Sequence, residues 1–133
     1  MITVLVVDDD PTLIFLMKRL LQKTEKVSEV RVASNGKEAI DILSGGEWLP
    51  DLIFLDINMP VMSGWDFLDE FSERYNGRTG CEIVMLSSST REMEIEQAAR
   101  HPEVSKYLSK PAIYATILEV VVETDIRKLT NLR

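Results

Sequence analysis

A chain of 133 residues is the length of one typical domain, and 45% apolar with 28% charged residues is ordinary globular composition, which argues against disorder. A net charge of −7 argues against direct nucleic-acid binding, and a single cysteine excludes an internal disulfide. No apolar run approaches the roughly 20 residues that span a bilayer, and no signal-peptide pattern opens the chain. We expect one cytoplasmic domain over residues 1–133, with no membrane insertion.

The chain opens with an apolar run over residues 2–7, which is typical of a strand buried on both faces of a parallel sheet. A helix is expected next, with Asp10 as its N-cap and Pro11 at its first position. Its apolar residues fall on one face, which would cover the sheet. These residues are Leu13, Leu16, Met17, Leu20 and Leu21.

The middle of the chain repeats this strand and helix pattern twice. A strand is expected over residues 30–33, and the next helix follows Asn35-Gly36 and ends at Gly45-Gly46, where the chain can leave in a left-handed conformation. The third strand is expected over residues 52–55. The third helix follows Ser63-Gly64 and continues to Tyr75.

The last third predicts two more strands, over residues 83–86 and around Tyr107 and Leu108. The fourth helix is expected to begin near Ser89, and its apolar stripe is thin. The fifth helix is expected to start at Pro111 and to bury one apolar face. That face comprises Ile113, Ile117, Leu118, Val121, Val122 and Ile126. The alternation predicts an α/β, flavodoxin-like, doubly wound (βα)5 fold with a five-stranded parallel sheet in the order 2-1-3-4-5.

Polar residues follow four of the predicted strands. The first strand ends in Asp8-Asp9-Asp10, the third in Asp56 and the fourth in Ser87, and the fifth leads to Lys110. Each feature alone has a plainer explanation, such as helix capping by Asp10 or a solvated charge on Lys110. Together they predict a cleft at the carboxyl edge of the sheet, where open α/β sheets bind ligands. Clustered carboxylates repel one another unless a cation neutralises them, and hard oxygen ligands favour Mg²⁺.

Five runs resemble the motifs of bacterial two-component response regulator receiver domains. They are Val-Leu-Val-Val-Asp-Asp-Asp-Pro at 4–11, Ile-Phe-Leu-Asp-Ile-Asn-Met-Pro at 53–60, Ser63-Gly64, Met-Leu-Ser-Ser at 85–88 and Tyr-Leu-Ser-Lys-Pro at 107–111. The resemblance covers essentially the whole chain, and the motifs occur in the family's order and spacing.

This resemblance implies a role for each matching residue. Asp56 is the phosphoacceptor, and Ser87 and Lys110 contact the phosphoryl group. The metal ligands are Asp9, Asp56 and the backbone carbonyl of Asn58, with Asp8 acting through a coordinated water. Ser87 and Tyr107 form the switch, whereas Asn58 and Ser89 tune dephosphorylation.

The resemblance also implies a phosphoacceptor switch rather than an enzyme acting on other molecules. Mg²⁺ or Mn²⁺ is the implied cofactor. A histidine kinase or phosphotransfer protein is the implied phosphodonor, because the chain lacks a G-x-x-x-x-G-K-[ST] loop for ATP. A downstream protein would read the signal on the face formed by the fourth helix, the fifth strand and the fifth helix.

Three details near the ends of the fourth and fifth strands are specific to this chain or testable in it. Ser87 stands where the family often has Thr, which keeps the hydroxyl. Ala112 stands where the family commonly has an aromatic residue, so the start of the last helix should be less filled. We further expect a cis bond between Lys110 and Pro111, as in similar receiver domains.

Three alternatives remain open at this stage. An aspartate-based phosphatase of the haloacid dehalogenase type would need a second acid where Asn58 stands. A flavin-binding electron carrier can share the fold, but Asp8 to Asp10 would repel a flavin phosphate. The chain can also be a receiver fragment of a longer multidomain regulator.

Overall fold

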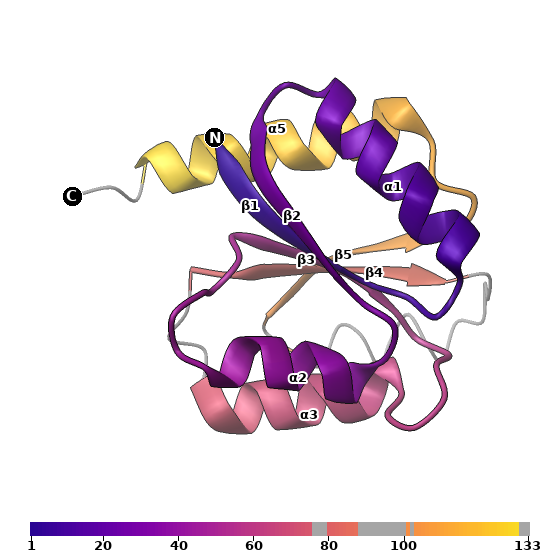
Figure 1. Ribbon diagram of the computed structural model, residues 1–133. Helices are drawn as coiled ribbons and strands as arrows, with labels where there is room; N and C mark the ends of the chain where they lie inside the picture. Colours follow the sequence, from indigo (N-terminus) through magenta and orange to yellow (C-terminus); the bar gives the residue numbers. More distant parts are fainter. Residues whose placement is uncertain (76–79, 88–100, 102, 131–133) are drawn as a thin grey trace.

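The computed structural model describes residues 1–75, 80–87, 101 and 103–130. Five parallel strands form one twisted sheet in the order β2-β1-β3-β4-β5, as the sequence predicts. The strands are β1 (Ile2–Val7), β2 (Val27–Ala33), β3 (Leu52–Asp56), β4 (Glu82–Ser87) and β5 (Val104–Ser109). The described helices are α1 (Pro11–Lys23), α2 (Gly36–Ser44), α3 (Gly64–Tyr75) and α5 (Tyr114–Thr130). Figure 1 shows α1 and α5 on one face of the sheet and α2 and α3 on the other.

The predicted strands are all present, and β2 differs most from its predicted bounds. It begins at Val27 instead of residue 30, because its first residues pair with β1 although they are polar or half-exposed. As an edge strand, β2 needs no continuous apolar run to complete its hydrogen bonds. None of the helices in the described ranges is long and apolar enough to cross a membrane.

Side-chain caps fix the predicted starts of the first two helices. The Asp10 carboxylate accepts a hydrogen bond of 2.9 Å from the Thr12 backbone N–H, and the Asn35 side chain accepts one of 2.9 Å from Glu38 N–H. After α2 the chain turns at Gly46, whose φ of 71° is the left-handed conformation expected there.

The last helix begins three residues later than predicted. Residues 110–113 form a turn, and α5 starts at Tyr114, with the backbone N–H of Ile117 donating to the carbonyl of Ile113. The predicted buried face is also partly wrong, because Ile113 and Ile126 are exposed whereas Val120 and Thr124 are buried. The fourth helix predicted near Ser89 lies outside the described residues.

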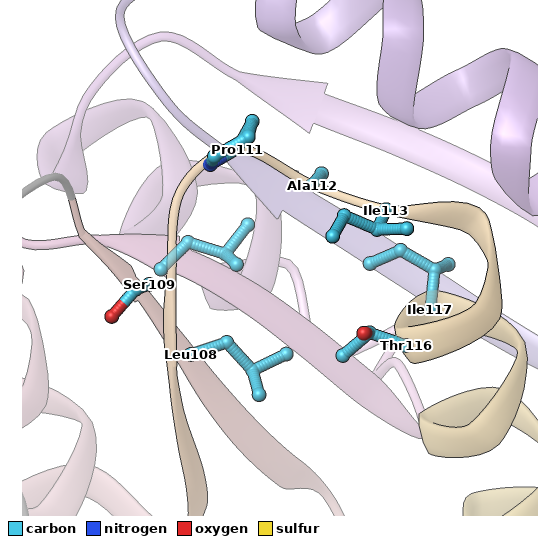
Figure 2. Close-up of a pocket in the computed structure, with 8 residues that line it drawn as sticks. Leu108, Ser109, Pro111, Ala112, Ile113, Thr116 and Ile117 are labelled. Atoms are coloured by element: carbon cyan, nitrogen blue, oxygen red, sulfur yellow. The ribbon is translucent and has the colours of Figure 1, made fainter.

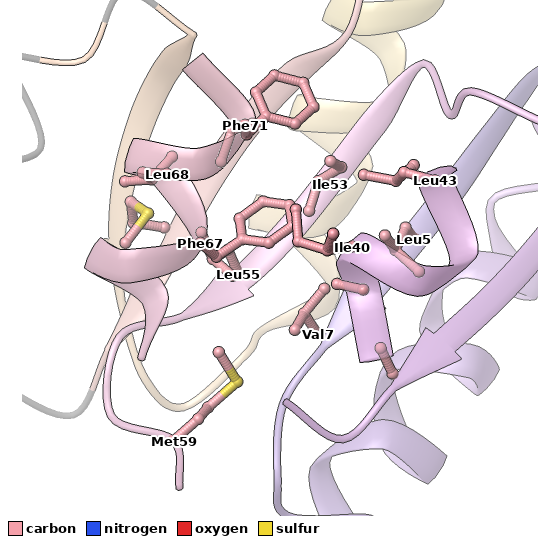
Figure 3. Close-up of a cluster of buried hydrophobic side chains, with 14 of the residues drawn as sticks. Leu5, Val7, Ile40, Leu43, Ile53, Leu55, Met59, Phe67, Leu68 and Phe71 are labelled. Atoms are coloured by element: carbon pink, nitrogen blue, oxygen red, sulfur yellow. The ribbon is translucent and has the colours of Figure 1, made fainter. Parts of the chain in front are cut away.

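Apolar side chains fill the space on both faces of the sheet. On one face, Phe67, Leu68 and Phe71 of α3 pack with Ile40 and Leu43 of α2 over the central strands (Figure 3). On the other face, α1 and α5 cover β1, β3 and β4, and this cluster includes Leu13, Met17, Leu21, Ile117, Val120 and Val121. The two layers leave the carboxyl ends of the strands as the edge where polar side chains gather.

Candidate functional site

The structure brings three carboxylates together at the carboxyl ends of β1 and β3. Val7 of β1 pairs with Leu55 of β3, so Asp8 and Asp56 follow at the same level of neighbouring strands. Asp8, Asp9 and Asp56 each offer one carboxylate oxygen, and these oxygens lie within 4.8 Å of one another. This is the cluster that the sequence predicts.

Asp8 is the most restrained member of the cluster. Its side chain is almost completely buried, and its Oδ1 accepts a hydrogen bond of 2.8 Å from the backbone N–H of Asp10. Its Oδ2 accepts one of 2.9 Å from Nζ of Lys110. Asp9, in contrast, is exposed, so its carboxylate can turn toward a bound ion without losing a partner in the part of the chain that the structure describes.

Asp56 lies in an environment that disfavours its charge. It is only 5% exposed, and burial raises its pKa to about 6 with a further contribution from the negative charge of Asp8. Lys110, whose Nζ lies 3.5 Å from Asp56 Oδ1, and the backbone N–H of Asn58 oppose this rise. At neutral pH the group is therefore mostly an ionised carboxylate that lacks a full countercharge.

Lys110 is aimed into the site by the end of β5. Its backbone N–H donates a hydrogen bond of 2.8 Å to the carbonyl of Ser87, and the Lys110–Pro111 bond is cis, as predicted. Burial acts to lower the pKa of Lys110, but the hydrogen bond to Asp8 and the charge of Asp56 outweigh it and raise the pKa. The lysine is therefore a permanent cation between two carboxylates.

The loop after β3 contains a close backbone contact that sequence reasoning did not identify. The backbone N–H of Gly64 donates a hydrogen bond of 2.8 Å to the carbonyl of Ile57. A Cβ atom at Gly64 would lie 2.4 Å from the backbone oxygen of Asp56. Gly64 thus lets α3 begin directly against the phosphoacceptor candidate. The sequence marks Gly64 through the Ser63-Gly64 motif at the predicted helix start, but it does not reveal the close approach to Asp56.

The two switch candidates lie on neighbouring strands. Ser87 is fully buried at the end of β4, where it pairs in register with Ser109 of β5. Tyr107 is half-buried on β5 and packs against the core cluster on the α2–α3 face. Asn58 is exposed beside Asp56, whereas Ser89 lies outside the described residues. Of the predicted site residues that the structure describes, Asp8, Asp9, Asp56 and Lys110 therefore form the tightest group.

The donor set fits a hard divalent cation. The three carboxylates have oxygen atoms close enough together to bind one ion, and oxygen is the ligand atom that Mg²⁺ and Mn²⁺ prefer. The raised pKa of Asp56 is a second indication, because it reports a carboxylate that a nearby positive charge would stabilise. Lys110 supplies only one such charge. Asp8, Asp9 and Asp56 are accordingly the residues that would hold the ion.

Comparisons with known proteins agree with this geometry. The model of the response regulator receiver domain family matches residues 4–122. The chain is 37% identical over 132 residues to protein-glutamate methylesterase/protein-glutamine glutaminase 3 of Burkholderia thailandensis, covering 97% of this chain and 35% of that protein. The chain therefore spans about a third of that relative's length.

Two solved structures are similar over most of both chains. A two component response regulator from Cytophaga hutchinsonii is 30% identical, with a TM-score of 0.84 and coverage of 94% of this chain and 96% of that one. The response regulator protein TrrA of Thermotoga maritima, solved in complex with Mg²⁺-BeF, is 28% identical. Its TM-score is 0.76, and the match covers 93% of this chain and 99% of TrrA.

Proposed function

This chain belongs to the response regulator receiver domain family, and from that premise we propose that Asp56 accepts a phosphoryl group and thereby switches the protein. One observation carries the proposal. Asp56 is a buried carboxylate flanked by Asp8, Asp9 and Lys110, so a nucleophile, a cation site and a fixed positive charge meet at one point. Phosphoryl transfer requires these three components.

Asp56 acts as the nucleophile in this proposal. With a pKa of about 6, it is ionised at neutral pH and can attack phosphorus. One carboxylate oxygen forms a bond to phosphorus while the bond between phosphorus and the donor's histidine nitrogen breaks. That nitrogen keeps the electron pair and takes up a proton from solvent. The product is an aspartyl phosphate on Asp56.

Lys110 and Ser87 stabilise charge on the transferred group. Lys110 Nζ lies 3.5 Å from Asp56 Oδ1, within reach of an oxygen on a phosphoryl group attached there. Ser87 ends the adjacent strand β4, where its hydroxyl can donate to another phosphoryl oxygen. Asn58 and Ser89 remain the proposed tuning residues for loss of the phosphoryl group to water.

Mg²⁺ or Mn²⁺ is the proposed cofactor, and when bound it neutralises charge shared by the carboxylate and phosphoryl oxygens. We assign Asp9, Asp56 and the Asn58 carbonyl as direct ligands and Asp8 as a ligand through water. The Mg²⁺-BeF complex of TrrA supports an ion of this type in a related domain. Asp8 suits the outer role, because both its oxygens already accept hydrogen bonds from the protein.

The proposed phosphodonor is a histidine kinase or a phosphotransfer protein. The proposed output is protein contact through β5 and α5, together with the fourth helix that the sequence predicts outside the described residues. One alternative keeps the site and changes the context. The chain matches only 35% of the length of its Burkholderia thailandensis relative, which supports a receiver that forms part of a longer regulator. Sequencing the full open reading frame distinguishes the two.

Intact-mass measurement after incubation with acetyl phosphate tests the central proposal. The parent protein should gain one phosphoryl group with Mg²⁺ and remain unlabelled with excess chelator. Asp56→Asn should not be labelled, whereas Asp41→Asn, which changes an exposed aspartate on α2, should behave like the parent. Equal labelling of Asp56→Asn and the parent would contradict the assignment.

A further inference from the structure

A cavity of about 210 Å³ lies beside the carboxylate site, on the α1–α5 face of the sheet. It opens between the ends of β4 and β5 and the start of α5 (Figure 2). Its lining residues are Leu86, Leu108, Ser109, Pro111, Ala112, Ile113, Thr116 and Ile117. The small side chain of Ala112 contributes to the open space, as the sequence predicts for this position.

The lining determines which chemistry fits. Among the described residues it contains no Asp, Glu, Lys or Arg side chain, so these residues offer no partner for a charged ligand. Leu86 and Ile117 form a buried apolar wall. Thr116 adds a hydroxyl that points toward the space between Leu108 and Ile117 in Figure 2. The accessible lining is polar and apolar in about equal parts, so a neutral ligand that combines apolar surface with a hydrogen-bonding group matches these walls.

The size of the cavity narrows the choice of ligand further. An engineered apolar protein cavity of about 150 Å³ stays dry and binds benzene. The cavity here is larger, at about 210 Å³, and has room for a bicyclic aromatic molecule. Flat aromatic molecules also lose little conformational entropy on binding. We propose that this cavity is a binding site for a small neutral aromatic molecule of indole size that carries one hydrogen-bonding group.

The position of the cavity links this site to the carboxylates. Ser109 and Pro111 flank Lys110 in the chain, and Leu86 directly precedes Ser87. A bound molecule therefore contacts residues on either side of the lysine that pairs with Asp8. Binding itself depends on none of the carboxylates, so this inference stands apart from the proposed phosphorylation of Asp56.

Titration of ¹⁵N-labelled protein with indole tests the proposal. We expect saturable amide shifts at Leu86, Leu108, Ala112 and Ile117, extending to Lys110, with a dissociation constant on the order of 1 mM, the range of small fragments. Asp56→Asn should bind indole like the parent, which separates this test from that of phosphorylation. Shifts that do not saturate, or that spread evenly over the surface, would overturn the proposal.

Three variants localise the binding. Ala112→Phe fills the cavity and should abolish the saturable shifts, whereas Ala115→Phe adds the same ring at an exposed position on α5 and should retain them. Thr116→Val removes only the hydroxyl, so it should weaken indole binding and leave benzene binding unchanged. Thermal unfolding of each variant verifies that it is folded. Equal indole binding by Ala112→Phe and the parent would place the ligand elsewhere and overturn the assignment.

Discussion

Nζ of Lys110 lies 2.9 Å from Oδ2 of Asp8, closer than the 3.5 Å that separates it from Oδ1 of Asp56. Without a metal ion, the lysine is thus the main countercharge of a carboxylate that we assign to metal binding. A cation entering the site must share Asp8 with this ammonium group, because the other Asp8 oxygen accepts from the Asp10 backbone. We therefore expect Lys110 both to compete with the ion and to prepare the site for a phosphoryl group.

The first prediction follows from this competition. Lys110→Met should tighten Mg²⁺ binding by about tenfold, because one charge-assisted hydrogen bond no longer opposes it. The same change should slow labelling by acetyl phosphate by about 100-fold, since a donor to the transferred group is lost. Calorimetric titration and intact-mass kinetics measure the two effects. Lys106→Met, which changes a lysine of β5 paired with Glu119 and Glu123, is the matched control. Weaker Mg²⁺ binding by Lys110→Met would contradict the competition.

The second prediction concerns the pH dependence of stability in the metal-free protein. In the folded state, burial raises the pKa of Asp56 from its ordinary 3.8 to about 6. Asp56 therefore binds a proton more tightly in the folded protein than in the unfolded chain. The contribution of Asp56 to the free energy of unfolding therefore becomes unfavourable as the pH rises from about 4 to 6, and it stays unfavourable at higher pH. Asp56→Asn removes this cost, and the variant should be more stable than the parent by about 3 kcal/mol at pH 7.5.

Urea unfolding at several pH values with excess chelator measures this difference. The stabilities of parent and Asp56→Asn should converge near pH 4 and diverge as pH rises. Added Mg²⁺ should reduce the difference at pH 7.5, because it stabilises the ionised Asp56 of the parent. Asp41→Asn should show no such pH-dependent divergence. A constant difference between Asp56→Asn and the parent across this range would rule out the raised pKa as its cause.

The third prediction ranks the two acids after β1. Asp9→Ala should weaken Mg²⁺ binding more than Asp8→Ala, because the exposed Asp9 has no partner to give up among the described residues, whereas Asp8 is held by Lys110 and Asp10. Calorimetric titration of both variants with Mg²⁺ gives the comparison. Asp10→Ala, which removes only a helix cap, is the control and should bind Mg²⁺ like the parent. Equal affinities of the Asp8 and Asp9 variants would remove the distinction between inner and outer ligands.

The fourth prediction tests the close approach at Gly64. The Cβ of Gly64→Ala would meet backbone atoms of Asp56 and Ile57, which cannot move as a flexible side chain can. We expect a loss of roughly 2–3 kcal/mol in the free energy of unfolding, together with slower labelling of Asp56. Gly45→Ala is the control, because a Cβ there meets nothing within 4 Å. A Gly64→Ala protein as stable as Gly45→Ala would show that the loop can relax.

The sequence was sufficient to predict the sheet, its order and the carboxylate cluster. Buried parallel strands are continuous apolar runs, and strand order then places Asp8 beside Asp56. It was insufficient at positions where tertiary contacts override local pattern. Pro111 favours a helix start, yet α5 begins at Tyr114, after the chain has placed Lys110. The pairing of Lys110 with Asp8 is likewise a contact between residues 102 positions apart, which no local pattern encodes.

The last prediction concerns the coupling between Ser87 and Tyr107. Ser87 is fully buried at the end of β4, and Tyr107 lies half-buried on the neighbouring strand. A phosphoryl group on Asp56 adds negative charge and acceptor oxygens that can draw the Ser87 hydroxyl inward, so that Tyr107 moves into the space released. Ser87→Ala removes the hydroxyl and leaves Asp56 in place. It should therefore bind beryllium fluoride, a phosphoryl mimic, but fail to transmit the change.

Amide hydrogen exchange with and without beryllium fluoride tests this coupling. In the parent, we expect altered exchange along β5 and the start of α5, with little change in α1 and α2. In Ser87→Ala, the response of β5 should be lost while amides next to Asp56 still report binding. Ser105→Ala, which changes an exposed serine on β5, is the control and should respond like the parent. A ligand shifts the equilibrium between the switched and unswitched states only by its difference in affinity for them. An unaltered β5 response in Ser87→Ala would therefore mean that the Ser87 hydroxyl contributes nothing to this difference in affinity.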